Sequence, residues 1–416
     1  MKQTKSMVTG TNNIELFIEL GSQPNGNIFF TPDEIYKEEL FTLNMSVCKD
    51  SWLVQLDEFP TPNEMFSNHP YISGYSEPVV EHFKYLSKHI INKINLKENS
   101  LVIDIGANDG SLLSCFKNNG MITFGIDPGN ITGKLAKDNG IHVAKTFWDT
   151  NTANSLKNLG ITPDLITATA VFYHVPDLHN FVKGLTTIMD DKSVFVCQCV
   201  YLKDIIENLQ FDHFYHEHTC IYSVNSLHIL FKMNGMKIFS IEHNSIHGGS
   251  IIVYASKIES HVEIDNSVNE FLLIEEEFGI KSLKTYHDFS IKVKNNIENL
   301  RNILINIKNN NESIYGIGAP VKGSTLLNYA NINTSLVSKI IEVNPHKIGK
   351  VVPGVHIPIV SEDSITKHPD YYLLLAWNFK DYFLRKYESY ILKGGKLIIP
   401  NPEVHIVDKT NLYKYI

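Results

Sequence analysis

A short polar segment, FDHFYHEHTCIYS at residues 211–223, carries the side chains best suited to acid–base chemistry. Tyr215, Glu217 and His218 lie within four residues of one another, and His216 between them faces the other way if the segment is extended. A histidine beside a carboxylate or a phenol can act as a general acid or base, because its pKa lies near neutral pH. The order H-E-H lacks the H-E-x-x-H spacing of zinc proteases. Taken alone, these residues fit a solvated polar loop better than a catalytic site.

The stretch LVIDIGANDGSLLSCF, residues 101–116, predicts a strand, a tight glycine turn and a helix. Such a unit opens a doubly wound α/β domain. Gly106 and Gly110 allow a ligand to approach the backbone, and the start of the helix supplies free N–H groups. Asp104 lies at the end of the strand, and Asp127 ends the next apolar run. An acid about 20 residues after the glycine turn is placed to accept hydrogen bonds from ribose hydroxyls.

The ligand of this turn is predicted from its order, G-A-N-D-G. A dinucleotide site requires G-x-G-x-x-G, so a pyrophosphate is poorly served here. S-adenosylmethionine carries an ammonium, a sulfonium and a ribose but no phosphate, and an acid before the turn suits it. The turn resembles the first motif of class I methyltransferases, with Asn108 where a glycine is commoner. The expected cofactor contacts are Asp104, Gly106, Asn108, Gly110 and Asp127. The alternative is a turn that only connects strand and helix.

Composition describes a soluble protein of more than one domain. The chain has 416 residues, which is too long for one ordinary hydrophobic core. Its residues are 43% hydrophobic and 20% charged, as in soluble globular proteins. Its net charge of −8 argues against a nucleic-acid or membrane-surface partner, although a local basic pocket for a nucleotide sugar is compatible with it. The N-terminus has no signal-peptide core, no run reaches membrane length, and the five cysteines lack paired spacing. We therefore expect a cytoplasmic protein with reduced thiols.

The chain divides into four predicted parts. Residues 1–75 form a small cap of short strands and turns, and residues 76–256 form an α/β domain with a parallel sheet and two antiparallel strands around HGGS. Residues 257–310 form a helical connector, whose apolar residues between Tyr286 and Ile307 recur every three or four positions. Residues 311–416 repeat the strand–helix rhythm. The predicted fold class is α/β: a Rossmann-like methyltransferase domain with an N-terminal cap and a second, C-terminal Rossmann-like domain.

Taken together, the motifs resemble the sugar C-methyltransferase family along nearly the whole chain. They are LVQLDEFPTPNEMFS (53–67), YISGYS (71–76), IGANDGSLL followed by GIDP, VFYHVPDLHNF (171–181), YHEH (215–218), HGGS (247–250), YGIGAPVKGSTLLNYANI (315–332) and NPHKIGKVVPGVHIPI (344–359). Members of this family methylate a carbon of a nucleotide-linked keto-deoxysugar. The resemblance therefore implies a methyltransferase that uses S-adenosylmethionine and acts next to the ketone of a 4-keto-deoxysugar, with dTDP as the expected carrier.

The resemblance also implies roles for single residues. His218 matches the base that removes the proton next to the ketone, and Tyr215 and Glu217 match its neighbours. His174 matches another active-site histidine, and Tyr71 or Tyr75 supplies a phenol from the cap. The expected contacts of the sugar nucleotide are His247, Lys322, Asn344 and Lys347. The second glycine segment, GIGAPVKGS at 316–324, is not a P-loop, and a plain turn with one exposed lysine is the alternative.

The chain departs from the family in its cap. The family holds a zinc ion there through two pairs of cysteines, whereas the first region here reads MVTGTNN and the second keeps only Cys48. One thiolate cannot form a tetrahedral site, so we expect no zinc. Packing is expected to hold the cap instead, through Phe29, Phe30, Leu40, Trp52 and Leu53. Further departures are Thr169 and Ala170, where asparagines are usual, and Glu342, where an aspartate is commoner.

Three alternative functions follow from the same residues. An O- or N-methyltransferase would keep the cofactor but needs no proton exchange at carbon. A catalytically silent protein that binds nucleotide sugars is suggested by the altered cap. A nicotinamide-dependent dehydrogenase is disfavoured by the glycine spacing. The sequence does not specify the sugar, the methylated carbon, its stereochemistry or the oligomeric state, and it leaves dTDP, GDP and CDP open as the nucleotide carrier.

Overall fold

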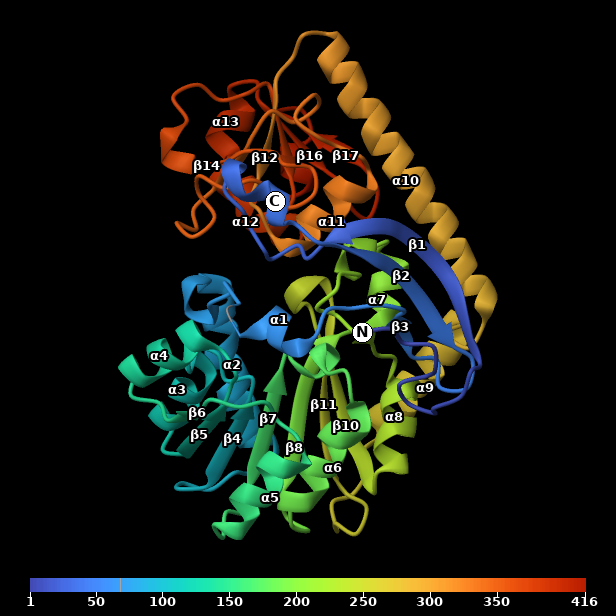
Figure 1. Ribbon diagram of the computed structural model, residues 1–416, viewed down its shortest axis with the longest axis vertical. Coiled ribbons are helices and arrows are strands. Elements are labelled where there is room, and N and C mark those ends of the chain that lie inside the picture. Colours follow the sequence, from blue (N-terminus) through green and yellow to red (C-terminus); the bar gives the residue numbers. More distant parts are fainter. Residues whose placement is uncertain (68) are drawn as a thin grey trace.

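The computed structural model describes residues 1–67 and 69–416. Its strands form three sheets, of four, seven and six strands in chain order. Figure 1 shows the C-terminal sheet above the seven-stranded sheet, with the long helix α10 (Leu283–Asn309) running along one side of the molecule from the lower to the upper part. No helix among these residues is long and apolar enough to cross a membrane.

The cap is an antiparallel sheet. Its strands β1 (Ile14–Pro24), β2 (Leu40–Cys48) and β3 (Val54–Leu56) are followed in the sheet by β9 (Cys220–Ile221), which pairs with β3. The acid–base segment therefore runs directly into the cap sheet. Phe29 and Leu53 are buried in the cap, but Leu40 is 58% exposed, so its predicted packing role is wrong. Leu40 pairs with Pro24 at the far end of the β1–β2 ribbon.

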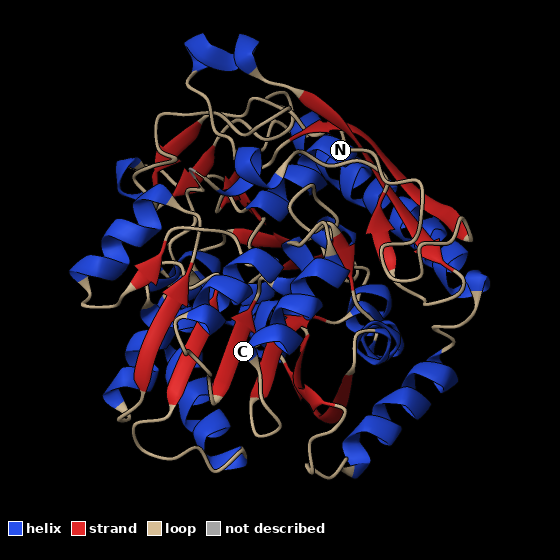
Figure 2. Ribbon diagram, turned by 60° about the horizontal axis from the view of Figure 1, so that its bottom comes forward, coloured by secondary structure: helices blue, strands red, loops and turns tan. Residues whose placement is uncertain are grey.

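The seven-stranded sheet has the order β10-β11-β8-β7-β4-β5-β6, with helices packed around it (Figure 2). Its strands are β4 (Leu101–Ile105), β5 (Ile122–Ile126), β6 (Val143–Ala144), β7 (Leu165–Thr169), β8 (Val194–Val200), β10 (Met236–Asn244) and β11 (Ser250–Lys257). Its helices are α2 (Glu77–Lys93), α3 (Ser111–Asn118), α4 (Asn130–Asp138), α5 (Thr150–Asn158), α6 (Leu178–Ile188), α7 (Leu202–Glu207) and α8 (Val224–Met233).

The first five of these strands are parallel, and the β10–β11 hairpin is antiparallel to β8. This confirms the predicted α/β fold and the two antiparallel strands around HGGS. The central strand β4 pairs with β5 on one side and β7 on the other, so the carboxyl ends of all three strands meet. In an open parallel sheet, that edge is where ligands bind.

The connector consists of α9 (Asn266–Phe278) and α10. The predicted apolar stripe of α10 is confirmed, because Tyr286, Phe289, Val293, Ile297, Leu300, Leu304 and Ile307 are all buried. At one end the ring of Tyr286 stacks on Trp52 of the cap, with the ring centroids 6.1 Å apart. Farther along, the Asn296 amide donates a hydrogen bond to the carbonyl of Pro400 at 2.8 Å. The helix therefore packs against both the cap and the C-terminal domain.

The C-terminal domain is a six-stranded sheet of order β14-β13-β12-β15-β16-β17, parallel except for β17. Its strands are β12 (Ile314–Ile317), β13 (Ile340–Glu342), β14 (Ile359–Ser361), β15 (Tyr371–Leu374), β16 (Lys396–Ile399) and β17 (His405–Val407). Its helices are α11 (Val321–Tyr329), α12 (Lys380–Lys386) and α13 (Glu388–Leu392). The predicted second strand–helix series is thereby confirmed.

Candidate active site

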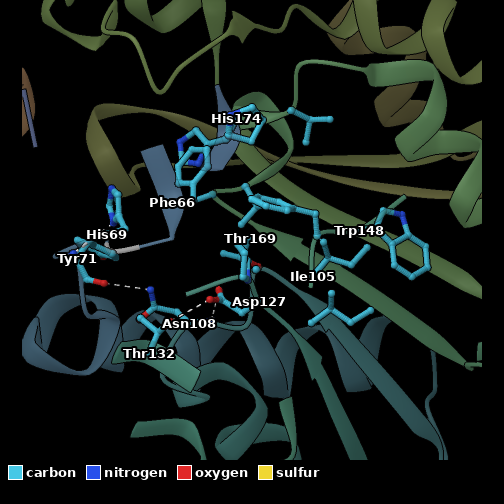
Figure 3. A pocket seen from close by; sticks show the side chains of 18 of the residues that line it. Phe66, His69, Tyr71, Ile105, Asn108, Asp127, Thr132, Trp148, Thr169 and His174 are labelled. Atoms are coloured by element: carbon cyan, nitrogen blue, oxygen red, sulfur yellow. Dashed lines mark hydrogen bonds between the residues drawn. The ribbon is translucent and has the colours of Figure 1, made fainter. Parts of the chain in front are cut away.

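A cavity of about 410 Å³ lies at the carboxyl ends of β4, β5 and β7 (Figure 3). That volume is within the usual range for a site that binds a small molecule. Cap residues, helix α2, the loops after the central strands and the turn between β10 and β11 all contribute to its lining. The labelled side chains around it are Phe66, His69, Tyr71, Ile105, Asn108, Asp127, Thr132, Trp148, Thr169 and His174.

The glycine turn shapes the floor of the cavity. Gly106 has φ +74°, and an added Cβ would lie 2.3 Å from a methyl carbon of Val171, so only glycine fits there. The backbone N–H of Asn108 donates to Asp127 Oδ2 at 3.0 Å. Asp127 Oδ1 accepts two further hydrogen bonds, from the N–H of Gly129 at 2.8 Å and the hydroxyl of Thr132 at 2.9 Å. The Asp127 carboxylate is thus fixed at the cavity wall by three protein donors.

The side chain of Asn108 holds the cap against the turn. Its amide donates to the carbonyl of Tyr71 at 3.1 Å and accepts from the N–H of Ser73 at 3.0 Å. The neighbouring Asp109 accepts from the N–H of Gly74 at 2.9 Å. Asparagine also tolerates the left-handed backbone required here, φ 51°. The departure from glycine at this position therefore has a structural reason.

Two predicted cofactor residues lie behind the cavity wall. Asp104 is 3% exposed and accepts a 2.6 Å hydrogen bond from the hydroxyl of Thr167. Burial raises the pKa of Asp104 to about 7. Gly110 begins α3 with φ +77°, where an added Cβ would lie 3.0 Å from Ile141. Neither residue lines the cavity, whereas Gly106, Asn108 and Asp127 do.

The acid–base segment forms a tight turn rather than an extended strand. The N–H of His218 donates to the carbonyl of Tyr215 at 2.9 Å, which closes the turn. The rings of these two residues lie 3.9 Å apart, centroid to centroid. The His218 ring is also 5.2 Å from the ring of His174, which lines the cavity. His216 points elsewhere, 5.6 Å from the ring of Phe41 in the cap.

The histidines of this cluster are held neutral. Burial lowers the pKa of His218 well below its usual value, and the nearby His174 and His213 add to the effect. Burial likewise lowers the pKa of His174 to about 4. Within the described part of the chain, Nδ1 of His218 and Nε2 of His174 have no hydrogen-bond partner. Buried polar atoms are rarely left unpaired, so these two nitrogens are suited to contact a bound ligand.

Glu217 is held by two cap residues that the sequence analysis did not identify. The Asn27 amide donates to both carboxylate oxygens at 2.9 Å, and His69 Nε2 lies 3.1 Å from Oε2. The N–H of Tyr71 donates to Nδ1 of His69 at 3.3 Å, so the proton of that ring is on Nε2 and points to Glu217. Burial favours the neutral acid, but His69 and Asn27 outweigh it and lower the pKa of Glu217.

The remaining predicted residues occupy different places. His247 and Tyr71 line the cavity, whereas Tyr75 does not and is 62% exposed. Lys322 is buried rather than exposed, with Nζ 3.4 Å from Nε2 of His213 and 4.6 Å from the ring centre of Trp377. Burial lowers the pKa of Lys322 to about 8.

Lys347 and Asn344 lie outside the cavity wall, beside the second glycine turn. Lys347 Nζ donates to the carbonyl of Ala319 at 2.8 Å, and the Asn344 side chain accepts from the N–H of His346 at 2.9 Å. Glu342 accepts from the N–H of Ala319 at 2.8 Å, so this acid closes the turn much as Asp127 closes the first one.

The sheet order, the glycine turn and the cavity at the ends of β4, β5 and β7 define a class I methyltransferase domain. Residues 79–241 match the family model of a methyltransferase domain, residues 245–402 that of a C-methyltransferase C-terminal domain, and residues 8–66 that of a putative zinc binding domain. The chain is 29% identical to C-methyltransferase NovU of Streptomyces niveus over 94% of its own length and 93% of that protein. The three family models and this relative together support a C-methyltransferase that uses S-adenosylmethionine.

Two solved methyltransferase structures each match less than half of the chain. Magnesium protoporphyrin IX methyltransferase of Synechocystis, with bound S-adenosylmethionine, is 15% identical over 44% of this chain and 82% of its own, with a TM-score of 0.33. A possible histamine N-methyltransferase of Thermotoga maritima is 17% identical over 44% of this chain and 92% of its own, also with a TM-score of 0.33. TM-scores this low support no conclusion about function.

The zinc ion implied by the cap model does not fit the residues present. Across residues 1–67 and 69–416, no three histidine, cysteine, aspartate or glutamate side chains are grouped so as to hold a metal ion. Cys48 is the one cysteine in the region that matches the model. Structural zinc sites need four ligands, chiefly thiolates and imidazoles. Interactions other than metal coordination must therefore hold the cap in its folded conformation.

Proposed function

We propose that this enzyme methylates a carbon next to the ketone of a nucleotide-linked 4-keto-deoxysugar, with dTDP as the carrier. The resemblance of the motifs to sugar C-methyltransferases supports the substrate class. The observation that carries the chemistry is the buried Tyr215–His218 turn, which places a neutral imidazole next to His174 at the cofactor cavity. Transfer to carbon requires such a base, because the carbon becomes nucleophilic only when it loses a proton.

His218 is proposed as the base. Its low pKa keeps the imidazole unprotonated at neutral pH, so that it can accept the proton next to the ketone. The hydroxyls of Tyr215 and Tyr71 are proposed to donate hydrogen bonds to the oxygen on which negative charge develops. Glu217, bound to Asn27 and His69, fixes the turn against the cap.

S-adenosylmethionine, when bound, supplies the methyl group as an electrophile. Asp127, Gly106 and the backbone of Asn108 would hold it, because all three line the cavity and the carboxylate is fixed by three protein donors. Among the proposed sugar contacts, His247 has the strongest support because it lines the same cavity. Lys322 does not line the cavity, and it is proposed to influence the sugar site indirectly, through its contact with His213.

Proton exchange tests this proposal. The protein is incubated in deuterium oxide with a dTDP-4-keto-6-deoxysugar and S-adenosylhomocysteine, and deuterium next to the ketone is followed by NMR. We expect exchange with the wild type and a loss of about 10²–10⁴-fold in its rate with His218→Gln. Binding of S-adenosylhomocysteine by calorimetry should be unchanged in that variant, because His218 is proposed to contact the sugar rather than the cofactor. Methylation of a hydroxyl or amine without any exchange would contradict the proposal.

A further inference from the structure

Two loops of the cap keep the spacing of a zinc site but not its ligands. The first loop carries Ser6 and Thr9, and the second carries Cys48 and Ser51, each pair separated by two residues. This is the C-x-x-C spacing of structural zinc sites, with three of the four thiols replaced by hydroxyls. Ser6 is 3% exposed, and Cys48 and Ser51 are fully buried. Both loops lie within residues 8–66 or directly before them, where the chain matches the zinc-binding model.

The two loops have the same backbone geometry. In the first, the N–H of Gly10 donates to the carbonyl of Ser6 at 2.9 Å, and in the second the N–H of Trp52 donates to the carbonyl of Cys48 at 2.7 Å. Each bond spans four residues. The Ser6 hydroxyl oxygen also accepts from the N–H groups of Val8 at 3.3 Å and Thr9 at 3.1 Å. The Ser6 side chain therefore points back toward the backbone of its own loop.

Hydrogen bonds join the loops directly. The Thr9 hydroxyl lies 3.7 Å from the sulfur of Cys48. Burial raises the pKa of the Cys48 thiol, but hydrogen bonding by Ser51 and Ser6 outweighs it and lowers the pKa. At the rim, the Asp50 carboxylate accepts from the Thr11 hydroxyl and the Asn13 amide, both at 2.6 Å. The second loop is therefore bonded to the first through several side chains.

We propose that the Ser6, Thr9, Cys48 and Ser51 side chains form a hydrogen-bonded cluster that replaces zinc, and that these four positions retain the geometry of a metal site. Neutral hydroxyls are not ligands of structural zinc, so the wild-type loops do not need the metal. Because the backbone of both loops is kept, restoring the thiols should restore binding. This inference concerns the cap alone and does not depend on the proposed substrate.

The experiment compares the wild type with the variant S6C/T9C/S51C. The full chain is produced with added zinc, passed through a desalting column, and analysed for zinc by mass spectrometry. We expect less than about one tenth of a zinc ion per wild-type chain and about one per variant chain. Cobalt(II) in place of zinc should give the variant the visible absorption of a tetrahedral thiolate site. A chelator should lower the melting temperature of the variant and leave that of the wild type unchanged.

The control S6C/T11C/S51C carries the same number of new thiols, with one moved out of the C-x-x-C spacing. It should bind no stoichiometric zinc. Cys48→Ser provides a second measurement if the triple variant does not fold, because a fourth hydroxyl should leave the cap folded and metal-free. One chelatable zinc per wild-type chain would overturn the proposal. So would a folded triple variant without zinc, or a Cys48→Ser protein that unfolds unless zinc is added.

Discussion

Buried histidines that stay neutral dominate the chemistry of this protein at the scale of single residues. His174, His216 and His218 lie within or beside one turn, each with its pKa lowered by burial. A neutral imidazole is useful as a base, but it also makes the folded state sensitive to acid. The unfolded chain takes up protons on these side chains at a pH where the folded chain does not.

His216 allows this sensitivity to acid to be measured at a histidine that is not the proposed base. Its pKa is about 4 in the folded protein and about 6.5 when unfolded. Its stabilising contribution is therefore complete above about pH 6.5 and is lost as the pH falls toward 4. When the pH is lowered from about 7 to about 5, the free energy of unfolding should fall in both proteins. The fall should be about 2 kcal/mol smaller in His216→Gln than in the wild type, because the variant lacks this histidine. Urea unfolding at the two pH values measures this, and equal losses would contradict the assignment.

Asn27 tests how the cap supports Glu217. Asn27→Leu keeps the size of the side chain but removes the amide that donates to both carboxylate oxygens. Hydrogen bonds to a buried charge contribute about 1.5–3 kcal/mol, so we expect a loss of that order in the free energy of unfolding near neutral pH. A double-mutant cycle with Glu217→Gln supplies the control. If the two substitutions are simply additive, the contact does not stabilise the protein.

At the scale of elements, the first glycine turn anchors the cap, in addition to its proposed role in binding the cofactor. Asn108 anchors the cap through its hydrogen bonds to Tyr71 and Ser73. Asn108→Gly preserves the backbone conformation but removes both bonds. We expect the affinity for S-adenosylmethionine to fall by about tenfold, since each lost hydrogen bond costs about 1 kcal/mol and part of the cavity wall is released. Calorimetric titration measures the affinity.

A matched control lies at the other end of the same helix. Asn119 follows α3, and its amide donates to the carbonyl of Cys115 in that helix rather than to the cap. Asn119→Gly should therefore leave the affinity for S-adenosylmethionine unchanged. A similar loss of affinity in both variants would show that the effect comes from the helix rather than from the contact with the cap.

Periodicity predicted the long elements well, because they bury a regular face. The stripe of α10 and the strands of both α/β series follow directly from the spacing of apolar residues. The two-residue strand β9 has no such pattern, and its partner β3 lies far away in the sequence. The same distance conceals Asn27 and His69, which reach Glu217 from the cap. The sequence analysis did not name Trp148, which lines the cavity. Its position could have been predicted, because loops that follow parallel strands line the ligand site.

At the scale of the whole molecule, the C-terminal domain places a buried cation next to the histidines of the central domain. Nζ of Lys322 lies 3.4 Å from His213, and its charge contributes to lowering the pKa of His213, His218 and His247. Asp212, also nearby, opposes the loss of charge from Lys322. One domain thus helps to keep the proposed base of another unprotonated.

Lys322→Met should therefore change the pH profile of methyl transfer. Without the ammonium group, His218 is protonated more easily, so the rate should begin to fall at a higher pH than in the wild type as the solution is acidified. The turnover rate measured from about pH 8 to 5.5 reports this shift. Lys339→Met, which removes a cation over Tyr315 in the same domain, should leave the profile unchanged. A uniform loss of rate without a shift would assign Lys322 a structural role.

The pairing of β9 with β3 also limits how this enzyme can be recombined with its relatives. A chimera cut near residue 75 would exchange three strands of the cap sheet but keep the fourth from the original protein. The mismatch would fall directly after the Tyr215–His218 turn, and would separate Glu217 from its partners Asn27 and His69. The cap and the segment 211–223 therefore form one structural unit, and a chimera that preserves activity has to exchange both together.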